Sequence, residues 1–234
     1  MATTTSRRAL GALLLAAAAA VAGGIAGCSG EDEPDPAAAV QASYRAYAEA
    51  VATKDGAASA GLVSGSTLDH YSGLRDLALT ADRATLAKER VVDQLAVLSM
   101  RANIPVATLR DADPRGVVSA AVQNQVISSG GAGAAALERI TVDGDAATAS
   151  LGVAGGSQQV PMRFRREGGT WKVDLTALLT PAEDALGSAL ERQGMTPEAM
   201  LTQVMTTRVG AARARQLWTP LDRQLPGSRP TGTP

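Results

Sequence analysis

The sequence predicts an α+β domain in which helices precede and follow a four-stranded antiparallel sheet. Three observations support this prediction. Apolar residues recur at helical spacing from Ala37 to Val126. From Leu137 to Leu175, apolar and polar residues alternate instead, in four short runs. Glycine-containing turns separate these runs, at Asp143-Gly144, Gly155-Gly156 and Gly168-Gly169.

The residues before the sheet are expected to form four helices. The first is Ala37–Thr53, and a second, less regular helical stretch covers Ala58–Leu79. The third runs from about Ala81 to Ala102 and is closed by Pro105. The fourth follows Asp113-Pro114, which supplies an N-cap and a first-turn proline. The apolar stripes expected on the first, third and fourth helices are Val40, Tyr44, Tyr47 and Val51; Ala84, Ala87, Val91, Leu95 and Leu98; and Val117, Val118, Ala121, Val122 and Val126.

The four strands are expected at Leu137–Val142, Ala146–Val153, Gln158–Glu167 and Thr170–Leu175. Their alternation predicts one apolar and one polar face, as in an antiparallel sheet that is covered on one side. The apolar face is expected to hold Ile140, Val142, Ala149, Leu151, Val153, Val160, Met162, Phe164, Trp171, Val173 and Leu175.

Two further helices are expected after the sheet. Thr180–Glu183 has the pattern of a capping box with proline at the first helical position, and Gly194 fits the residue after a helix end. Thr196-Pro197 then opens the last helix, which Leu217–Pro220 stops. The apolar side expected on this last helix is Met200, Val204 and Ala211.

Three passages carry a resemblance to a known superfamily. They are the first helix running into Thr53–Gly56, the passage Ile140–Ala146, and the strand Gly169–Leu175. In this order they resemble the nuclear transport factor 2-like (cystatin-like) superfamily. The resemblance implies a cone in which a curved sheet wraps a long N-terminal helix. The long helical stretch from Asp82 and the C-terminal helices are additions to that fold.

Residues 1–27 have the three parts of a bacterial export signal. Arg7-Arg8 provides positive charge without an acid, and Ala9–Ala22 is an uncharged apolar run. A membrane-spanning helix needs about 20 apolar residues, whereas this run is shorter and ends at Gly23-Gly24. The tetrapeptide Ile25–Cys28 resembles the lipobox of bacterial lipoproteins. That resemblance implies cleavage before Cys28 and a diacylglycerol thioether, of the kind that carries palmitate, on its sulfur.

The expected location is the extracytoplasmic face of the cell membrane, with the protein held by the lipid on Cys28. An acidic tether at 28–36 would precede a single domain at 37–225 and a disordered tail at 226–234. Arg7-Arg8 leaves both the twin-arginine and the general secretory export routes open. The scarcity of lysine beside arginine resembles proteins from GC-rich genomes such as those of actinobacteria.

Charge and side-chain chemistry exclude several functions. Residues 1–27 hold two of the 22 basic residues and none of the 23 acidic ones, so the mature chain has a net charge of −3. That balance argues against nucleic acid as a partner. Cys28 is the only cysteine and His70 the only histidine. With the thiol acylated, we expect no disulfide, no metal and no cofactor.

Three groups of residues are candidates for function. His70, beside Asp69 or another carboxylate, is a candidate for acid–base catalysis, or it is a surface histidine without a catalytic role. Tyr44, Tyr47 and Trp171 could line a small apolar cavity, or they are core residues. Arg163, Arg165 and Lys172 could bind an acidic partner on the polar sheet face, or they form a solvated surface with cross-strand ion pairs.

The favoured function is a membrane-anchored lipoprotein with a non-enzymatic binding or scaffold domain. Its partners would be membrane lipid, through the anchor, and an envelope protein or a small apolar ligand. The alternative is a pocket enzyme of the isomerase, dehydratase or hydrolase type that uses His70 with Tyr44, Tyr47 or Asp76. A cavity filled by Val40, Tyr47, Phe164 and Trp171 would favour the scaffold.

Overall fold

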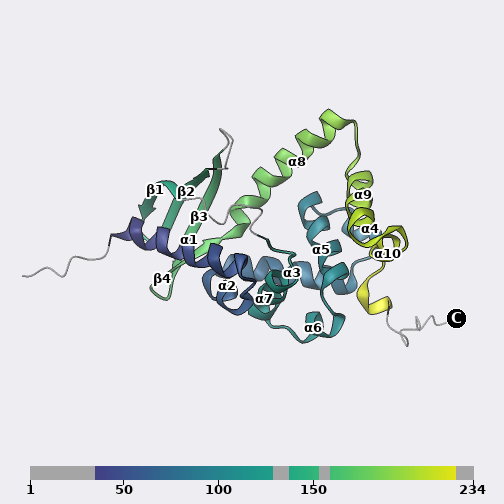
Figure 1. Ribbon diagram of the computed structural model, residues 1–234, viewed down its shortest axis with the longest axis horizontal. Helices are drawn as coiled ribbons and strands as arrows, with labels where there is room; N and C mark the ends of the chain where they lie inside the picture. Colours follow the sequence, from purple (N-terminus) through teal and green to yellow (C-terminus); the bar gives the residue numbers. More distant parts are fainter. Residues whose placement is uncertain (1–34, 129–136, 153–158, 225–234) are drawn as a thin grey trace, which may run out of the picture. The chain divides into compact units, whose positions relative to one another are not determined.

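The computed structural model describes residues 35–128, 137–152 and 159–224, and these residues have the predicted α+β class (Figure 1). Helices come first, a four-stranded antiparallel sheet follows, and helices end the domain. The predictions for Cys28, for the signal at 1–27, for the turn at Gly155-Gly156 and for the tail at 226–234 lie outside the described residues. The helices before the sheet are α1 (Pro36–Ala52), α2 (Gly56–Leu62), α3 (Gly65–Thr80), α4 (Arg83–Leu86), α5 (Val91–Asn103), α6 (Val106–Asp111) and α7 (Pro114–Gln123).

The first helix begins one residue earlier than expected. The Asp35 carboxylate accepts a hydrogen bond from the Ala37 amide at 3.0 Å, and Pro36 occupies the first turn. A side-chain acceptor and a proline are both favoured at these positions. Asp35 and Pro36 therefore belong to the helix and not to the tether. The predicted apolar stripe of α1 is confirmed, because all four of its residues are buried.

The two long helices expected from Ala58 to Ala102 are each broken, which corrects the sequence prediction. Val63 pairs with Val173 in an isolated parallel bridge, and the Ser64 amide donates to the Val173 carbonyl at 2.9 Å. The chain leaves the helix there to join the sheet edge, and Ser64 then caps α3 through the Thr67 amide.

The second break separates α4 from α5. Asp82 caps α4 by accepting from the Thr85 amide at 2.9 Å, and a turn leads to α5. The predicted stripe is wrong at Ala84 and Ala87, which are exposed. The buried apolar residues of this segment are Leu86, Val97, Leu98 and Met100.

The sheet is a meander in the order β1-β2-β3-β4, formed by Leu137–Asp143, Ala146–Gly152, Gln159–Glu167 and Thr170–Asp174. The predicted strands are confirmed to within about one residue, although Leu175 begins a 3₁₀ turn. A bulge in β1 lies between Glu138 and Thr141, where Arg139 has a φ of 52°. One extra residue in a strand reverses its alternation. Leu137 therefore lies on the same face as Ile140.

Helix α1 packs against β1 and β4 on the apolar face of the sheet. The Ser43 hydroxyl on α1 donates to the Trp171 carbonyl of β4 at 2.7 Å, which fixes the helix against the strand. The opposite face carries exposed polar residues, among them Thr148, Arg163 and Arg165. The predicted division into one apolar and one polar face is confirmed.

Two hydrophobic cores lie on either side of α7. Val118, Ala121 and Val122 join the core between α1 and the sheet, whereas Val117 and Ala120 join a second core. Side chains from α3, α4, α5, α6, α9, α10 and the last 3₁₀ turn make up the rest of that second core. An amphipathic helix usually buries one stripe. Because α7 buries two, it connects the sheet half of the domain to the helical half.

The C-terminal helices are α8 (Leu179–Gln193), α9 (Pro197–Val209) and α10 (Ala211–Gln216), preceded and followed by 3₁₀ turns at Leu175–Leu178 and Leu221–Arg223. The predicted end of α8 is confirmed, because Gly194 has a φ of 60°. The cap of α9 is also confirmed, since Thr196 accepts from the Ala199 amide at 3.2 Å. The single last helix expected after Thr196 is wrong, because Gly210 breaks it into α9 and α10. Its predicted apolar side is one position off in α9, whose buried residues are Leu201 and Met205, and Ala211 is exposed.

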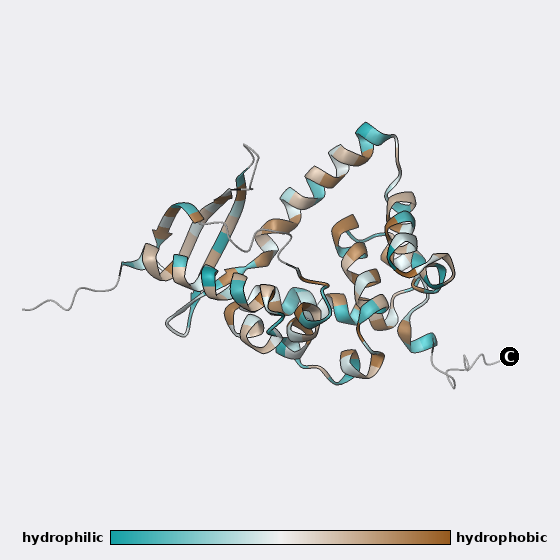
Figure 2. Cartoon of the chain, in the orientation of Figure 1, coloured by the Kyte–Doolittle hydropathy of each residue, from teal (hydrophilic) through white to brown (hydrophobic). Residues whose placement is uncertain are grey.

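The predicted capping box is wrong. Thr180 lies inside α8, and the Glu183 carboxylate accepts instead from the Val91 and Val92 amides of α5 at 3.0 and 3.1 Å. Helix α5 has no side-chain cap of its own. A carboxylate at a helix N-terminus satisfies free amides and interacts favourably with the helix dipole. Glu183 thus attaches α8 to α5. Helix α8 otherwise buries only Leu190, and hydrophobic and hydrophilic residues are interleaved along it (Figure 2).

Candidate functional site

The three candidate pocket residues come together, but as packed core. Tyr44, Tyr47 and Trp171 are buried in the cluster between α1 and the sheet. Val40 and Phe164 belong to the same cluster, with exposed fractions of 0% and 1%. These side chains fill the space in which the sequence placed a possible ligand cavity.

His70 pairs with a carboxylate, but not with its sequence neighbour. Its Nε2 atom lies 3.1 Å from Oδ1 of Asp93, which reaches it from α5 and is 7% exposed. Asp69 is exposed on α3. The pair joins α3 to α5 across the second core. Sequence reasoning missed Asp93, although a lone acid in the apolar run Val91–Leu98 was a usable signal.

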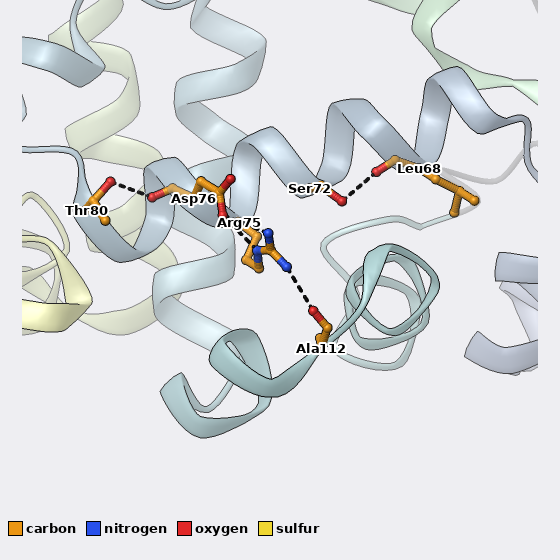
Figure 3. A network of polar contacts seen from close by, with 6 residues as sticks. All are labelled: Leu68, Ser72, Arg75, Asp76, Thr80 and Ala112. Atoms are coloured by element: carbon orange, nitrogen blue, oxygen red, sulfur yellow. Dashed lines mark hydrogen bonds and ion pairs between the residues drawn. The ribbon is translucent and has the colours of Figure 1, made fainter.

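Asp76, named with His70 in the enzyme hypothesis, is engaged elsewhere (Figure 3). Its carboxylate accepts from Nε of Arg75 at 2.9 Å and is exposed. Arg75 also donates from Nη1 to the Ala112 carbonyl at 2.8 Å. Asp76 therefore orients an arginine that links α3 to the segment between α6 and α7.

The tyrosines connect the His70–Asp93 pair to the first core. The Tyr71 ring meets the His70 ring edge-on, with centroids 5.7 Å apart, and packs against both cores. Burial raises the pKa of Tyr71, and the negative charge of Asp93 raises it further. Burial also raises the pKa of Tyr47, with smaller contributions from Tyr71 and Tyr44. Burial alone raises the pKa of Tyr44. These phenols stay neutral and are poorly suited to serve as bases.

The basic strip is smaller than expected. In the register of β3 and β4, Arg165 lies opposite Lys172 and Arg163 opposite Asp174. Nζ of Lys172 donates to the Gly61 carbonyl of α2, so its charge is directed to the sheet edge. Arg163 and Arg165 are exposed and form no ion pair with any residue in the described ranges. They remain available on the polar face.

Two cavities lie away from these residues. One, of about 410 Å³, is lined by residues of α5, α6, α10 and the last 3₁₀ turn, including Arg101 and Arg213. The other, of about 660 Å³, is a surface hollow along α9. Neither is lined by His70, Tyr44 or Trp171.

In the part of the chain that the structure describes, no three His, Cys, Asp or Glu residues are grouped closely enough to hold a metal ion. The helices of that part include none that is long and apolar enough to cross a membrane. What the fold defines is an α+β domain with one helix-covered antiparallel sheet. No family model matches the chain, and no curated protein or solved structure is significantly similar to it.

Proposed function

We propose that this chain is an exported bacterial lipoprotein, anchored to the extracytoplasmic face of the cell membrane through a diacylglycerol on Cys28. The observation that carries the proposal is the order of Arg7-Arg8, an uncharged run and Ile25–Cys28. A single acyl chain binds a membrane only marginally, so the two chains of a diacylglycerol are needed for stable anchoring. The first described helix starts at Pro36, so a short segment would separate the anchor from the domain.

We propose further that the anchored domain is a non-enzymatic scaffold. The packed core supports this, because Val40, Tyr47, Phe164 and Trp171 occupy the space between α1 and the sheet. In the described residues, every buried side-chain nitrogen and oxygen has a hydrogen-bond partner. Side chains packed in this way leave no room between α1 and the sheet for the concave cavity of a small-molecule site. The exposed Arg163 and Arg165 would then serve as the contact surface for an acidic envelope partner.

The likeness to the nuclear transport factor 2-like superfamily belongs to this proposal. A meander sheet with a long helix across its apolar face supports it. We propose a variant of that cone whose interior is filled and whose helical half is enlarged. Fold alone assigns no activity, so the scaffold role rests on the packing and not on the likeness.

The His70–Asp93 pair is the one observation that favours the enzyme alternative, since such pairs perform acid–base chemistry. We assign it a structural role instead. Asp93 is buried, the His70 ring contacts Tyr71, and the pair joins two helices. Replacing His70 by alanine should lower the free energy of unfolding. As long as the variant is folded and as abundant as the wild type, the envelope phenotype should not change. Loss of that phenotype in a His70→Ala protein that is folded at wild-type abundance would favour the enzyme.

Anchoring can be tested in cells. The full chain is expressed in a bacterial host fed with an alkyne analogue of palmitate, and membranes are separated from soluble fractions. We expect the wild-type protein to carry the label and to stay with the membranes, and Cys28→Ser to lose the label. Ser29→Ala is the matched control and should behave as wild type. Label on the Cys28→Ser protein, or wild-type membrane protein without label, would contradict the anchor.

A further inference from the structure

Arg101 carries a buried positive charge that no carboxylate of residues 35–128, 137–152 or 159–224 neutralises. Its side chain is 1% exposed and donates to the carbonyls of Ala78, Leu217 and Leu77 at 2.8 to 2.9 Å, and also to that of Ala81. Carbonyls satisfy N–H groups but bring no net charge. Burial lowers the pKa of Arg101 to about 10, so the guanidinium is still charged at neutral pH.

A second guanidinium stands beside the first. Arg213 of α10 is half-buried, and its Nη2 donates to the Arg101 carbonyl at 3.2 Å. Its other described contacts are long ones to the amide oxygens of Gln216 and Gln224, at 3.4 and 3.5 Å. No ion pair in the described ranges includes either arginine.

Both arginines line the cavity of about 410 Å³. The amides of Asn103 and Gln224 complete its polar side, and Ile104 and Leu221 form an apolar wall. Among the residues that the structure describes, none that lines it is acidic. Asp222, next in sequence to Leu221, is bound to Arg110 at 2.5 Å. The volume falls within the range of about 300–1,000 Å³ that is usual for small-ligand sites.

We infer that this cavity binds a small organic carboxylate, with the carboxylate on Arg213 and the apolar body against Ile104 and Leu221. Two unneutralised positive charges at one partly desolvated site attract an anion. A planar guanidinium matches a carboxylate by two parallel hydrogen bonds. The apolar wall favours an anion with a hydrocarbon body over a bare inorganic ion. This site is separate from the core and from the sheet face on which the scaffold role rests.

The test is an NMR titration of the full chain carrying Cys28→Ser, with benzoate as the probe. Benzamide is its neutral isostere, and inorganic phosphate is the anion without an apolar body. We expect benzoate to shift the amides of Asn103, Ile104 and Leu221 saturably, and both comparison molecules to bind at least roughly tenfold more weakly, the size expected for losing a charge-assisted contact. Equal binding of benzamide or phosphate, or shifts confined to other residues, would overturn the inference.

Two variants locate the charge. Arg213→Gln should weaken benzoate binding by roughly tenfold or more, whereas Arg215→Gln, on the same helix but outside the cavity, should leave it unchanged. Asn103→Asp is a nearly isosteric change at an exposed position, and it would place a competing carboxylate in the cavity wall. We therefore expect this variant not to bind benzoate. Wild-type affinity in a folded Arg213→Gln or Asn103→Asp protein would rule out the site.

Discussion

Replacing Arg101 by methionine is expected to destabilise the domain by about 3 kcal/mol. The long methionine side chain fills much of the same volume, so the change mainly removes the donors. Leu77 keeps the hydrogen bond from the Ala81 amide at 3.0 Å. The carbonyls of Ala78, Ala81 and Leu217 each lose the Arg101 donor, and all three of these contacts are buried.

The magnitude follows from those three carbonyls. A buried acceptor left without a partner costs about 1–3 kcal/mol, so three of them cost roughly 5 kcal/mol. Removing the charge itself relieves a desolvation penalty of a few kcal/mol, which offsets part of that loss. The loss exceeds the gain because the three carbonyls lie at the ends of α3 and α10, where the helices supply no further amides.

The assay is urea unfolding of the full chain carrying Cys28→Ser, followed by tryptophan fluorescence. Trp171 reports on the core at the sheet and Trp218 on the helical core. A loss of about 3 kcal/mol lowers the urea midpoint by roughly 1–2 M. Arg75→Met is the matched control, because Arg75 has one carbonyl partner and an exposed carboxylate. It should cost no more than about 1 kcal/mol.

Equal urea midpoints for Arg101→Met and Arg75→Met would contradict this prediction. That result would mean that the carbonyls at the ends of α3 and α10 find other donors, and that Arg101 does not hold the helical core together.

Three further predictions concern other parts of the domain. The pKa of each of the three tyrosines is raised, so their neutral forms stabilise the fold fully below pH about 10 and progressively less above it. Alkaline titration should therefore show tyrosinate absorbance appearing together with unfolding. Ionisation of any tyrosine in the folded protein would contradict this prediction. Glu183→Ala should lower the unfolding free energy by about 1 kcal/mol through the lost cap on α5, whereas Asp184→Ala should not; equal midpoints in urea would refute the cap. Arg163→Glu with Arg165→Glu should leave stability unchanged and reduce crosslinking to envelope proteins in cells, and undiminished crosslinking would remove the sheet face as the contact surface.

Local signals made the sheet predictable. The turns at Asp143-Gly144 and Gly168-Gly169 contain glycines with positive φ, a conformation that glycine adopts without steric cost. The caps at Asp113 and Thr196 were equally local, because each side chain bonds an amide three residues ahead. Such features depend on a few neighbouring residues, which a sequence displays directly.

What the sequence missed depends on contacts between distant residues. The helix break at Val63 exists because Val173 offers a strand edge 110 residues later. Glu183 fitted a local capping box, yet its carboxylate accepts hydrogen bonds from the amides at the N-terminus of α5. No local pattern marks Arg101, since its carbonyl partners come together only where α3 and the end of α10 meet. The partner of His70 was likewise 23 positions away, on another helix.

Mass spectrometry of the N-terminal peptide of the protein isolated from membranes would show whether a lipid on Cys28 anchors the chain. We expect a peptide that begins at Cys28 and carries the added mass of a diacylglyceryl group on its sulfur. A membrane-isolated protein whose first residue is any other, or whose Cys28 is unmodified, would contradict it.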